Sequence, residues 1–219
     1  MGLRAIVTGA TGLVGNRLIR ILLDDMRFES VHVLVRRRSG FVHPKFTEYL
    51  INFEKPEEWE HLVGGDILFS AMGTTLSKAG SKENQYRVDF TYQYQVAQAA
   101  SKNGVSDFVL VSSAGAKRDS VFFYTQMKGQ LEEAVQKLNF QRIFIMRPSF
   151  LMGTRQEIRQ SEKVIQVFAT VMTRIFFRKY RPIRARMVAQ AMINAVFFND
   201  DVRGTVIYEP GELFYLATR

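Results

Sequence analysis

The 219-residue sequence contains no cysteine, and this absence excludes several kinds of site. Disulfides, thiolate zinc sites, iron–sulfur clusters and cysteine nucleophiles all need a thiol group. Only three histidines are present, His32, His43 and His61, and they do not fall at metal-ligand spacings. We therefore expect no metal centre and no cysteine chemistry.

Long apolar runs are also missing. Charged residues interrupt every run well before the roughly eighteen residues that cross a bilayer. The sequence reaches an apolar strand by Leu3 and a glycine turn by Gly9, which leaves no room for a secretory signal. We therefore expect a cytoplasmic protein. The hydrophobic content of 47% and the charged content of 23% are those of a folded domain.

Short apolar strands alternate with amphipathic helices along the chain. The pattern predicts strands at 3–7, 31–35, 49–53, 67–71, 108–111, 142–146 and 205–208, and helices at 13–25, 83–102, 122–138, 162–177 and 186–198. This alternation indicates βαβ crossovers, and hence a doubly wound, mainly parallel α/β sheet. Without a repeat or a linker, residues 1–219 form one domain, in which 150–219 contribute a small substrate-side extension. Ligands bind such sheets at the carboxyl ends of the strands.

A glycine turn follows the first predicted strand and opens the first helix. Gly9 permits a tight turn, Gly12 lets the backbone approach a pyrophosphate, and Gly15 allows the helix to pack closely on the strand. The helix N-terminus offers unpaired N–H groups to phosphates. The alternative is that the glycines serve only a tight turn. The strand before them and the amphipathic helix after them favour a dinucleotide site.

The end of the second predicted strand indicates which dinucleotide binds. NAD-binding versions of this architecture usually have an acidic residue there, which bonds the ribose 2′-hydroxyl. Here the strand is followed by Arg36, Arg37 and Arg38. A guanidinium pairs with a 2′-phosphate, so we expect NADP(H) in preference to NAD(H), with Arg36 first and Arg37 second as contacts. A basic loop without a ligand is the alternative.

A tyrosine and a lysine lie four residues apart on a predicted helix. Tyr124 and Lys128 therefore share one helix face, and an ammonium group near a phenol favours the phenolate. Such a tyrosine exchanges a proton with a carbonyl or alcohol oxygen during hydride transfer. Ser112 and Ser113 end the preceding strand, and Ser113, which lies further past it, is the better candidate to orient that oxygen.

These motifs together resemble the short-chain dehydrogenase/reductase superfamily, specifically its small atypical members related to the human HIV Tat-interacting protein. The resemblance covers about the first 160 residues, with a Rossmann-like fold. Its further segments are Asn52-Phe53-Glu54-Lys55, Gly73-Thr74-Thr75, Lys78-Ala79-Gly80, Val88-Asp89, Gly115-Ala116, and Arg147-Pro148 with Arg155-Gln156-Glu157.

The resemblance also implies a role for individual residues. It implies pyrophosphate contacts by Gly9, Thr11, Gly12, Leu13 and Val14, 2′-phosphate contacts by Arg36 and Arg37, an adenine contact by Phe53, ribose contacts by Gly73 and Thr74, nicotinamide-ribose contacts by Tyr124 and Lys128, and a carboxamide contact by Pro148. Ser113 and Tyr124 would be catalytic, with Lys128 in support.

The sequence departs from the superfamily pattern in two places. Asp89 stands where many members have an asparagine that helps to relay protons. The spacing between Ser113 and Tyr124 is also much shorter than in sugar-nucleotide epimerases, and no large C-terminal insertion could form a sugar-nucleotide pocket. The first departure affects the relay, and the second argues against an epimerase.

Three functions are compatible with these features. The leading hypothesis is an NADPH-dependent reductase of a small carbonyl compound, with Phe150, Leu151 and Met152 either in the substrate pocket or simply in the core. The second is an NADP(H) sensor that acts through partner proteins. The third is binding of nucleic acid or an anionic membrane surface by the basic stretch 155–186, and it ranks last because no nucleic-acid motif accompanies the charge. The alternative for this stretch is a solvated helix face.

Overall fold

A seven-stranded sheet forms the centre of the protein. The computed structural model describes residues 2–152, 181–199 and 201–219. The strands lie in the order β3-β2-β1-β4-β5-β6-β9, and all six neighbouring pairs are parallel. They are β1 (Leu3–Thr8), β2 (Phe28–Val35), β3 (Phe46–Leu50), β4 (Ile67–Ser70), β5 (Asp107–Val111), β6 (Arg142–Met146) and β9 (Gly204–Tyr208).

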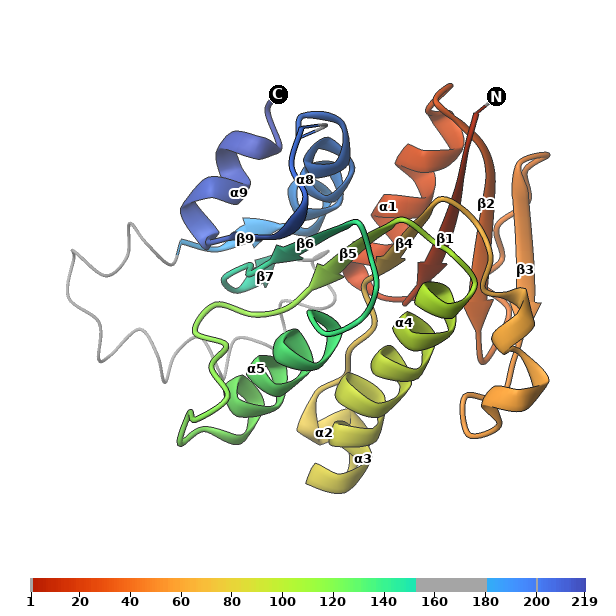
Figure 1. Cartoon of the computed structure of the whole chain (residues 1–219). Coiled ribbons are helices and arrows are strands. Elements are labelled where there is room, and N and C mark those ends of the chain that lie inside the picture. The colour runs from red at the N-terminus through yellow and green to blue at the C-terminus, as the bar shows by residue number, and fades with distance from the viewer. Residues whose placement is uncertain (1, 153–180, 200) are drawn as a thin grey trace.

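Helices cover both faces of the sheet (Figure 1). They are α1 (Leu13–Asp24), α2 (Leu76–Ala79), α3 (Lys82–Tyr86), α4 (Tyr92–Lys102), α5 (Phe123–Val135), α8 (Ala185–Phe197) and α9 (Pro210–Leu216). α1, α8 and α9 pack on one face, and α4 and α5 pack on the other. The doubly wound, Rossmann-like α/β fold predicted from the sequence is confirmed.

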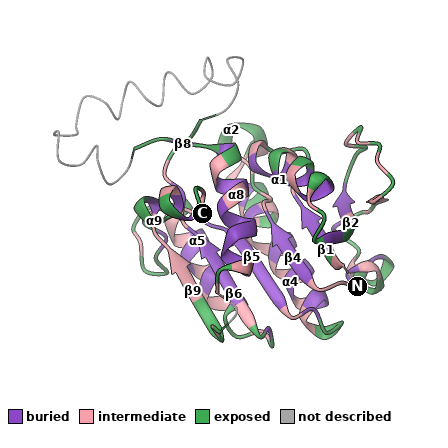
Figure 2. Cartoon of the chain, turned by 90° about the horizontal axis from the view of Figure 1, so that it is seen from above, coloured by how far each residue is buried: buried purple, intermediate pink, exposed green. Residues whose placement is uncertain are grey.

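The central strands are apolar on both sides because helices cover both. Along β1, Ala5, Ile6 and Val7 are all completely buried, and β4 and β5 are buried throughout. Figure 2 shows these strands as the buried centre of the molecule. Such continuous burial explains why the strands read as uninterrupted apolar runs rather than as alternating patterns.

Two predicted elements need correction. The third strand was expected at 49–53 but runs from Phe46 to Leu50, because Phe53 turns into the core and packs against Trp59. The helix expected at 83–102 is divided into α3 and α4 by a π-helical turn, Arg87–Thr91. π-turns are rare and occur often at functional sites.

The structure adds elements that the sequence pattern did not predict. Helix α9 follows β9 and begins with Pro210 at its first position, and Glu209 and Glu212 form a capping box around it. A short parallel pair, β7 (Leu151–Met152) with β8 (Ile183–Arg184), also forms. The helix predicted at 162–177 and most of the basic stretch 155–186 lie outside the described residues.

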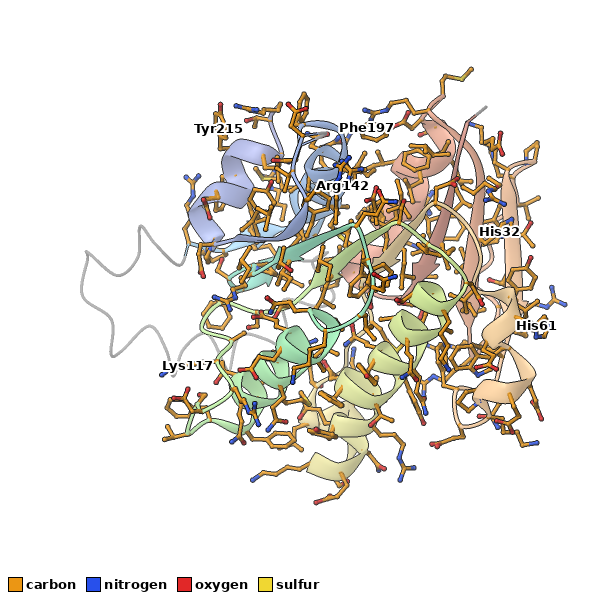
Figure 3. The ribbon with its side chains drawn as sticks, in the orientation of Figure 1. His32, His61, Lys117, Arg142, Phe197 and Tyr215 are labelled. Atoms are coloured by element: carbon orange, nitrogen blue, oxygen red, sulfur yellow. The ribbon has the colours of Figure 1, made fainter. Side chains whose placement is uncertain are left out.

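A buried ion pair fastens the amino ends of β5 and β6 to helix α8. Arg142, labelled in Figure 3, donates to both carboxylate oxygens of Asp107, and one of these distances, from Nε to Oδ1, is 2.8 Å. The same guanidinium donates to the carbonyl oxygens of Val196 and Asn199 at the end of α8. This pair lies at the edge of the sheet opposite to the one where ligands bind such folds.

Close packing of α1 on the glycine turn leads to a stability prediction. A Cβ on Gly15 would lie 2.1 Å from the carbonyl oxygen of Gly9, far inside van der Waals contact. Gly15→Ala should therefore lower the free energy of unfolding by about 3 kcal/mol, measured by urea denaturation. Gly211→Ala is the control, because a Cβ there meets nothing within 4 Å and should stabilise α9 by about 0.5 kcal/mol. Equal stabilities of the two variants would contradict the close approach.

Candidate functional site

The glycine turn lies against the residue that follows β4. Gly9 has a φ of 82°, and a Cβ there would lie 2.3 Å from the carbonyl oxygen of Ala71. Gly12 then caps α1 without a side-chain hydrogen bond, and it is exposed together with Thr11. The turn thus presents backbone rather than side chains, and the first N–H groups of the helix have no side-chain acceptor. Of the other predicted phosphate contacts, Leu13 is partly buried and Val14 is buried.

A basic cavity of about 230 Å³ lies between the end of β2 and the segment after β4. Its lining residues are Arg36, Thr74, Lys78, Ala79, Asn84, Arg87, Val88 and Tyr92. Three of them are cations from three different segments, and Val88 and Tyr92 add an apolar wall. Arg36 therefore lines the cavity, whereas Arg37 is exposed and is not among the lining residues.

Phe53 lies behind this cavity rather than on its surface. Its side chain is 4% exposed, and its ring stacks on Tyr92 with centroids 5.3 Å apart. Tyr92, whose hydroxyl donates to Glu54, is the aromatic residue that reaches the cavity. The sequence reasoning missed Tyr92. Its position four residues after Val88 is the signal that could have found it, because the two share one helix face.

Asp89 connects the segment after β4 with the helix that carries Lys128. The Asp89 side chain is 1% exposed, and its Oδ2 accepts a hydrogen bond from the Thr74 N–H at 2.7 Å. Its Oδ1 lies 3.2 Å from Lys128 Nζ, and the Lys128 side chain is 2% exposed. Asp89 Oδ1 would also lie 3.2 Å from a Cβ on Gly73. The predicted ribose-contacting residues and the predicted lysine are therefore joined by one carboxylate.

The environment of Lys128 favours its charged form. Burial disfavours the ammonium, but Tyr124, the Asp89 carboxylate and then Glu132 outweigh that effect and raise the pKa of Lys128 above its ordinary value. Lys128 Nζ lies 6.0 Å from the centre of the Tyr124 ring. Tyr124 itself is 40% exposed in the first turn of α5. A protonated lysine thus lies beneath an accessible phenol.

The two serines after β5 have different surroundings. Ser112 is 4% exposed and donates to the buried carboxylate of Glu132, which also accepts two hydrogen bonds from Arg147. Ser113 is partly buried, and among the described residues its hydroxyl makes one long contact, 3.3 Å to the carbonyl oxygen of Ala114. Ser112 is therefore occupied by a structural network, whereas the Ser113 hydroxyl has bonding capacity left for a ligand.

The loop between β5 and α5 is tied to its neighbours. The Lys117 N–H donates to the Thr125 carbonyl oxygen at 3.1 Å, so the loop folds back on the first turn of α5; Lys117 is labelled in Figure 3. Pro148, buried after β6, accepts a hydrogen bond from the Ala114 N–H at 2.9 Å. The segments that carry Ser113, Tyr124 and Pro148 are thus held together.

The apolar residues suggested for a substrate pocket are exposed. Phe150, Leu151 and Met152 are 45%, 37% and 44% exposed, and Phe122, directly before α5, is 73% exposed. The alternative of simple core packing does not describe them. Partly exposed apolar side chains thus lie close in sequence to both Pro148 and Tyr124.

Neither a metal cluster nor a membrane span is found where the structure can be described. Within residues 2–152, 181–199 and 201–219, no three His, Asp or Glu side chains form a group that could hold a metal ion. His32 and His61 lie on separate elements, β2 and the short helical turn Glu60–Leu62 (Figure 3). In the same ranges, no helix is long and apolar enough to cross a membrane.

Comparison with known proteins places the chain in a family. A family model described as NAD(P)H-binding matches residues 9–195. The protein named "Protein FMP52, mitochondrial" of Saccharomyces cerevisiae is 35% identical over 184 residues, which cover 82% of this chain and 79% of that protein. Its namesake in Aspergillus niger is 33% identical over 196 residues, covering 85% and 84%.

These relatives contradict the cytoplasmic location that we expected from the sequence. The proteins of Saccharomyces cerevisiae, Aspergillus niger and Candida albicans are all named as mitochondrial. The expectation rested on the lack of a secretory signal and of long apolar runs. Features of this kind do not distinguish the cytoplasm from an organelle.

Solved structures with the same fold belong to the short-chain dehydrogenase/reductase superfamily. A superfamily protein from Agrobacterium tumefaciens with bound NAD has a TM-score of 0.68 at 16% identity, covering 98% of this chain and 81% of that one. The UDP-glucose 4-epimerase of Thermotoga maritima has a TM-score of 0.67 at 15% identity, with the same coverage. At such identities the likeness concerns the fold alone. The family match and these relatives show that this chain belongs to the NAD(P)H-binding family, alongside the fungal FMP52 proteins.

Proposed function

We propose that this protein is an NADP(H)-dependent oxidoreductase that reduces a carbonyl group of a small molecule. The observation that carries the proposal is the buried Lys128 ammonium, which lies 6.0 Å from the accessible Tyr124 ring and pairs with Asp89, the acceptor of the Thr74 N–H after β4. A dinucleotide fits the glycine turn, because Gly12 is exposed at the start of α1 and caps the helix without a side-chain hydrogen bond, which leaves backbone N–H groups of the first turn to a phosphate. When bound, the cofactor supplies the hydride.

The residues of the chain would manage the proton. Tyr124 donates its hydroxyl proton to the carbonyl oxygen as the hydride reaches the carbon, and the product is an alcohol. Ser113 donates a hydrogen bond to the same oxygen and orients it. Lys128, whose side chain is 2% exposed, would stabilise the resulting phenolate by its charge. Tyr124 then regains a proton from solvent, which reaches it through its exposed side.

The basic cavity supports NADP(H) rather than NAD(H) as the cofactor. Arg36, Lys78 and Arg87 line it, and no carboxylate takes the place after β2 that would bond a 2′-hydroxyl. Arg87 pairs with Glu54 at 3.2 Å, which leaves Arg36 and Lys78 as the cations available to a 2′-phosphate. The substrate would be apolar, because the exposed side chains of Phe122, Leu151 and Met152 lie within a few residues of Tyr124 or Pro148 in the sequence.

A second candidate function is an NADP(H) sensor without turnover. The observation in its favour is the direct ion pair between Asp89 and Lys128, where many superfamily members have a neutral asparagine. The carboxylate offsets part of the lysine charge that would support the phenolate of Tyr124. Tight NADPH binding with no turnover of any aldehyde, ketone or quinone would favour the sensor.

We further propose a mitochondrial location for this protein, by similarity to its named relatives. A fluorescent fusion at the C-terminus should coincide with a mitochondrial marker in cells and sediment with mitochondria on fractionation. A diffuse cytoplasmic signal in both assays would reject the proposal.

The proposed acid is tested by removing one hydroxyl. Tyr124→Phe should lower kcat for NADPH-dependent carbonyl reduction about 100-fold or more, while the NADPH Kd stays within about threefold, because the ring and Lys128 remain. Tyr86→Phe is the control, since Tyr86 donates its hydroxyl to Gln130 on the neighbouring helix. Comparable turnover of wild type and Tyr124→Phe would exclude Tyr124 as the proton donor.

The proposed cofactor preference is tested at Arg36. Arg36→Gln should raise the NADPH Kd about tenfold and leave the NADH Kd within about twofold, because only NADPH carries the 2′-phosphate. Both constants can be measured by the fluorescence of the bound reduced cofactor. Arg38→Gln is the control, since Arg38 is exposed and does not line the cavity. An equal rise in the Kd of NADPH and of NADH would argue against a 2′-phosphate site.

A further inference from the structure

A series of buried polar groups runs from the end of β1 to Lys128, with one link through the main-chain carbonyl of Asp89. Thr8 Oγ1 donates to Ser70 Oγ at 3.2 Å, and Ser70 Oγ donates to Gln93 Oε1 at 2.8 Å. Gln93 Nε2 donates to the Asp89 carbonyl oxygen at 2.7 Å, and the Asp89 carboxylate pairs with Lys128. Thr8 directly precedes Gly9, so the series extends from the glycine turn to the lysine beside Tyr124.

None of these polar groups is reached by solvent. Thr8, Ser70, Gln93, Asp89 and Lys128 are each at most 2% exposed. Burying an ion pair costs desolvation energy, and well-packed apolar residues are often at least as stabilising. Stability alone therefore does not explain a series of polar groups here. Its position between β1 and β4, where ligands bind this kind of fold, indicates a functional reason.

Asp89 is the branching point of the series. One carboxylate oxygen accepts the Thr74 N–H at 2.7 Å, and the other lies 3.2 Å from the Lys128 ammonium. A carboxylate accepts through both oxygens, whereas an amide has only one acceptor oxygen. Asparagine at this position would have to turn its NH₂ group toward one of two donors. Aspartate offers an oxygen to each partner: Oδ2 accepts the Thr74 N–H, and Oδ1, which has no hydrogen-bond partner among the described residues, forms the ion pair with Lys128.

We infer that Asp89 is a positioning residue that holds the Gly73–Thr74 segment and Lys128 as one unit, and that Gln93 keeps Asp89 in place. The inference rests on the proposed function, which assigns the Gly73–Thr74 segment to the cofactor ribose and Lys128 to the reaction. Through Asp89, the segment that binds the cofactor and the lysine that supports Tyr124 move together. Ordering one of them therefore orders the other.

The first test replaces the branching carboxylate. Asp89→Asn should speed amide hydrogen exchange of segment 71–80 about tenfold in the cofactor-free protein, because one of the two contacts is lost. The NADPH Kd should rise about tenfold as well. Turnover of a carbonyl compound should show kcat about tenfold lower with its KM within about twofold, a split that general destabilisation does not produce.

A matched control removes a buried carboxylate elsewhere. Asp107→Asn breaks the ion pair with Arg142 at the opposite edge of the sheet. The Asp107 side chain is 7% exposed and the Arg142 side chain is 14% exposed. The substitution should lower the stability of the protein, but exchange of 71–80, the NADPH Kd and kcat should stay within about twofold of wild type, measured below the melting temperature of each variant.

The second test acts on Gln93, whose side chain bonds the Asp89 carbonyl oxygen and Ser70. Gln93→Met keeps the shape of the side chain. It should speed the exchange of 71–80, raise the NADPH Kd and lower kcat, each by about threefold. Asn194→Leu is the control, because Asn194 is a buried amide with two hydrogen bonds, to Leu216 and Gln190, on the other face of the sheet. Asn194→Leu should leave the exchange of 71–80, the NADPH Kd and kcat unchanged.

The outcomes separate this inference from the proposed function. Exchange and NADPH Kd within twofold of wild type in Asp89→Asn would overturn the inference, as would equal changes in Asp107→Asn. If the wild type binds NADPH but reduces no carbonyl compound, the reductase function is contradicted. The amide exchange of 71–80 and the NADPH Kd of Asp89→Asn would still test the positioning role of Asp89. If the wild type does not bind NADPH, the amide exchange of 71–80 in Asp89→Asn alone tests whether Asp89 holds this segment.

Discussion

The Lys128 ammonium lies where water does not reach it, and the carboxylate of Asp89 balances its charge. An unpaired charge at such a site would cost several kcal/mol, so the two residues have to be buried together. This requirement fixes the position of α5 relative to the π-turn Arg87–Thr91, because the two partners come from these segments. It also fixes the Thr74 backbone, which shares the same carboxylate.

The site around this pair depends on close approach of backbone segments. Gly9 and Gly15 bring the turn after β1 against β4 and α1, where any side chain would collide with a carbonyl oxygen. Hydrogen bonds between the loops after β5 and β6 hold Ser113 and Pro148 in neighbouring segments. The proposed site residues therefore lie on segments that backbone contacts hold together, an arrangement that the proposed reaction would need. Arg147, bound to Glu132 and Glu209, links the same helix α5 to α9.

Several parts of the fold and the site were accessible from the sequence. Strands β1, β4 and β5 are buried on both faces and read as plain apolar runs, and the glycine spacing identified the turn before α1. Other features depended on long-range packing. Phe53 is a core residue stacked on Tyr92, although it reads as an adenine contact, and the third strand begins earlier because Phe53 turns inward. Lys78 and Arg87 line the basic cavity with Arg36, which no local pattern revealed.

The sequence by itself determined the fold class and the dinucleotide turn, because periodicity and glycine spacing are local properties of the backbone. The sequence also identified Tyr124 and Lys128 as a candidate catalytic pair, since residues four apart share a helix face. Only the tertiary structure decided what Asp89 does. Its two partners, Thr74 and Lys128, are 15 and 39 positions away and meet it only when β4 and β5 pair and α4 and α5 pack side by side. Contacts over such separations depend on the packing of whole elements, which a local pattern of residues does not record.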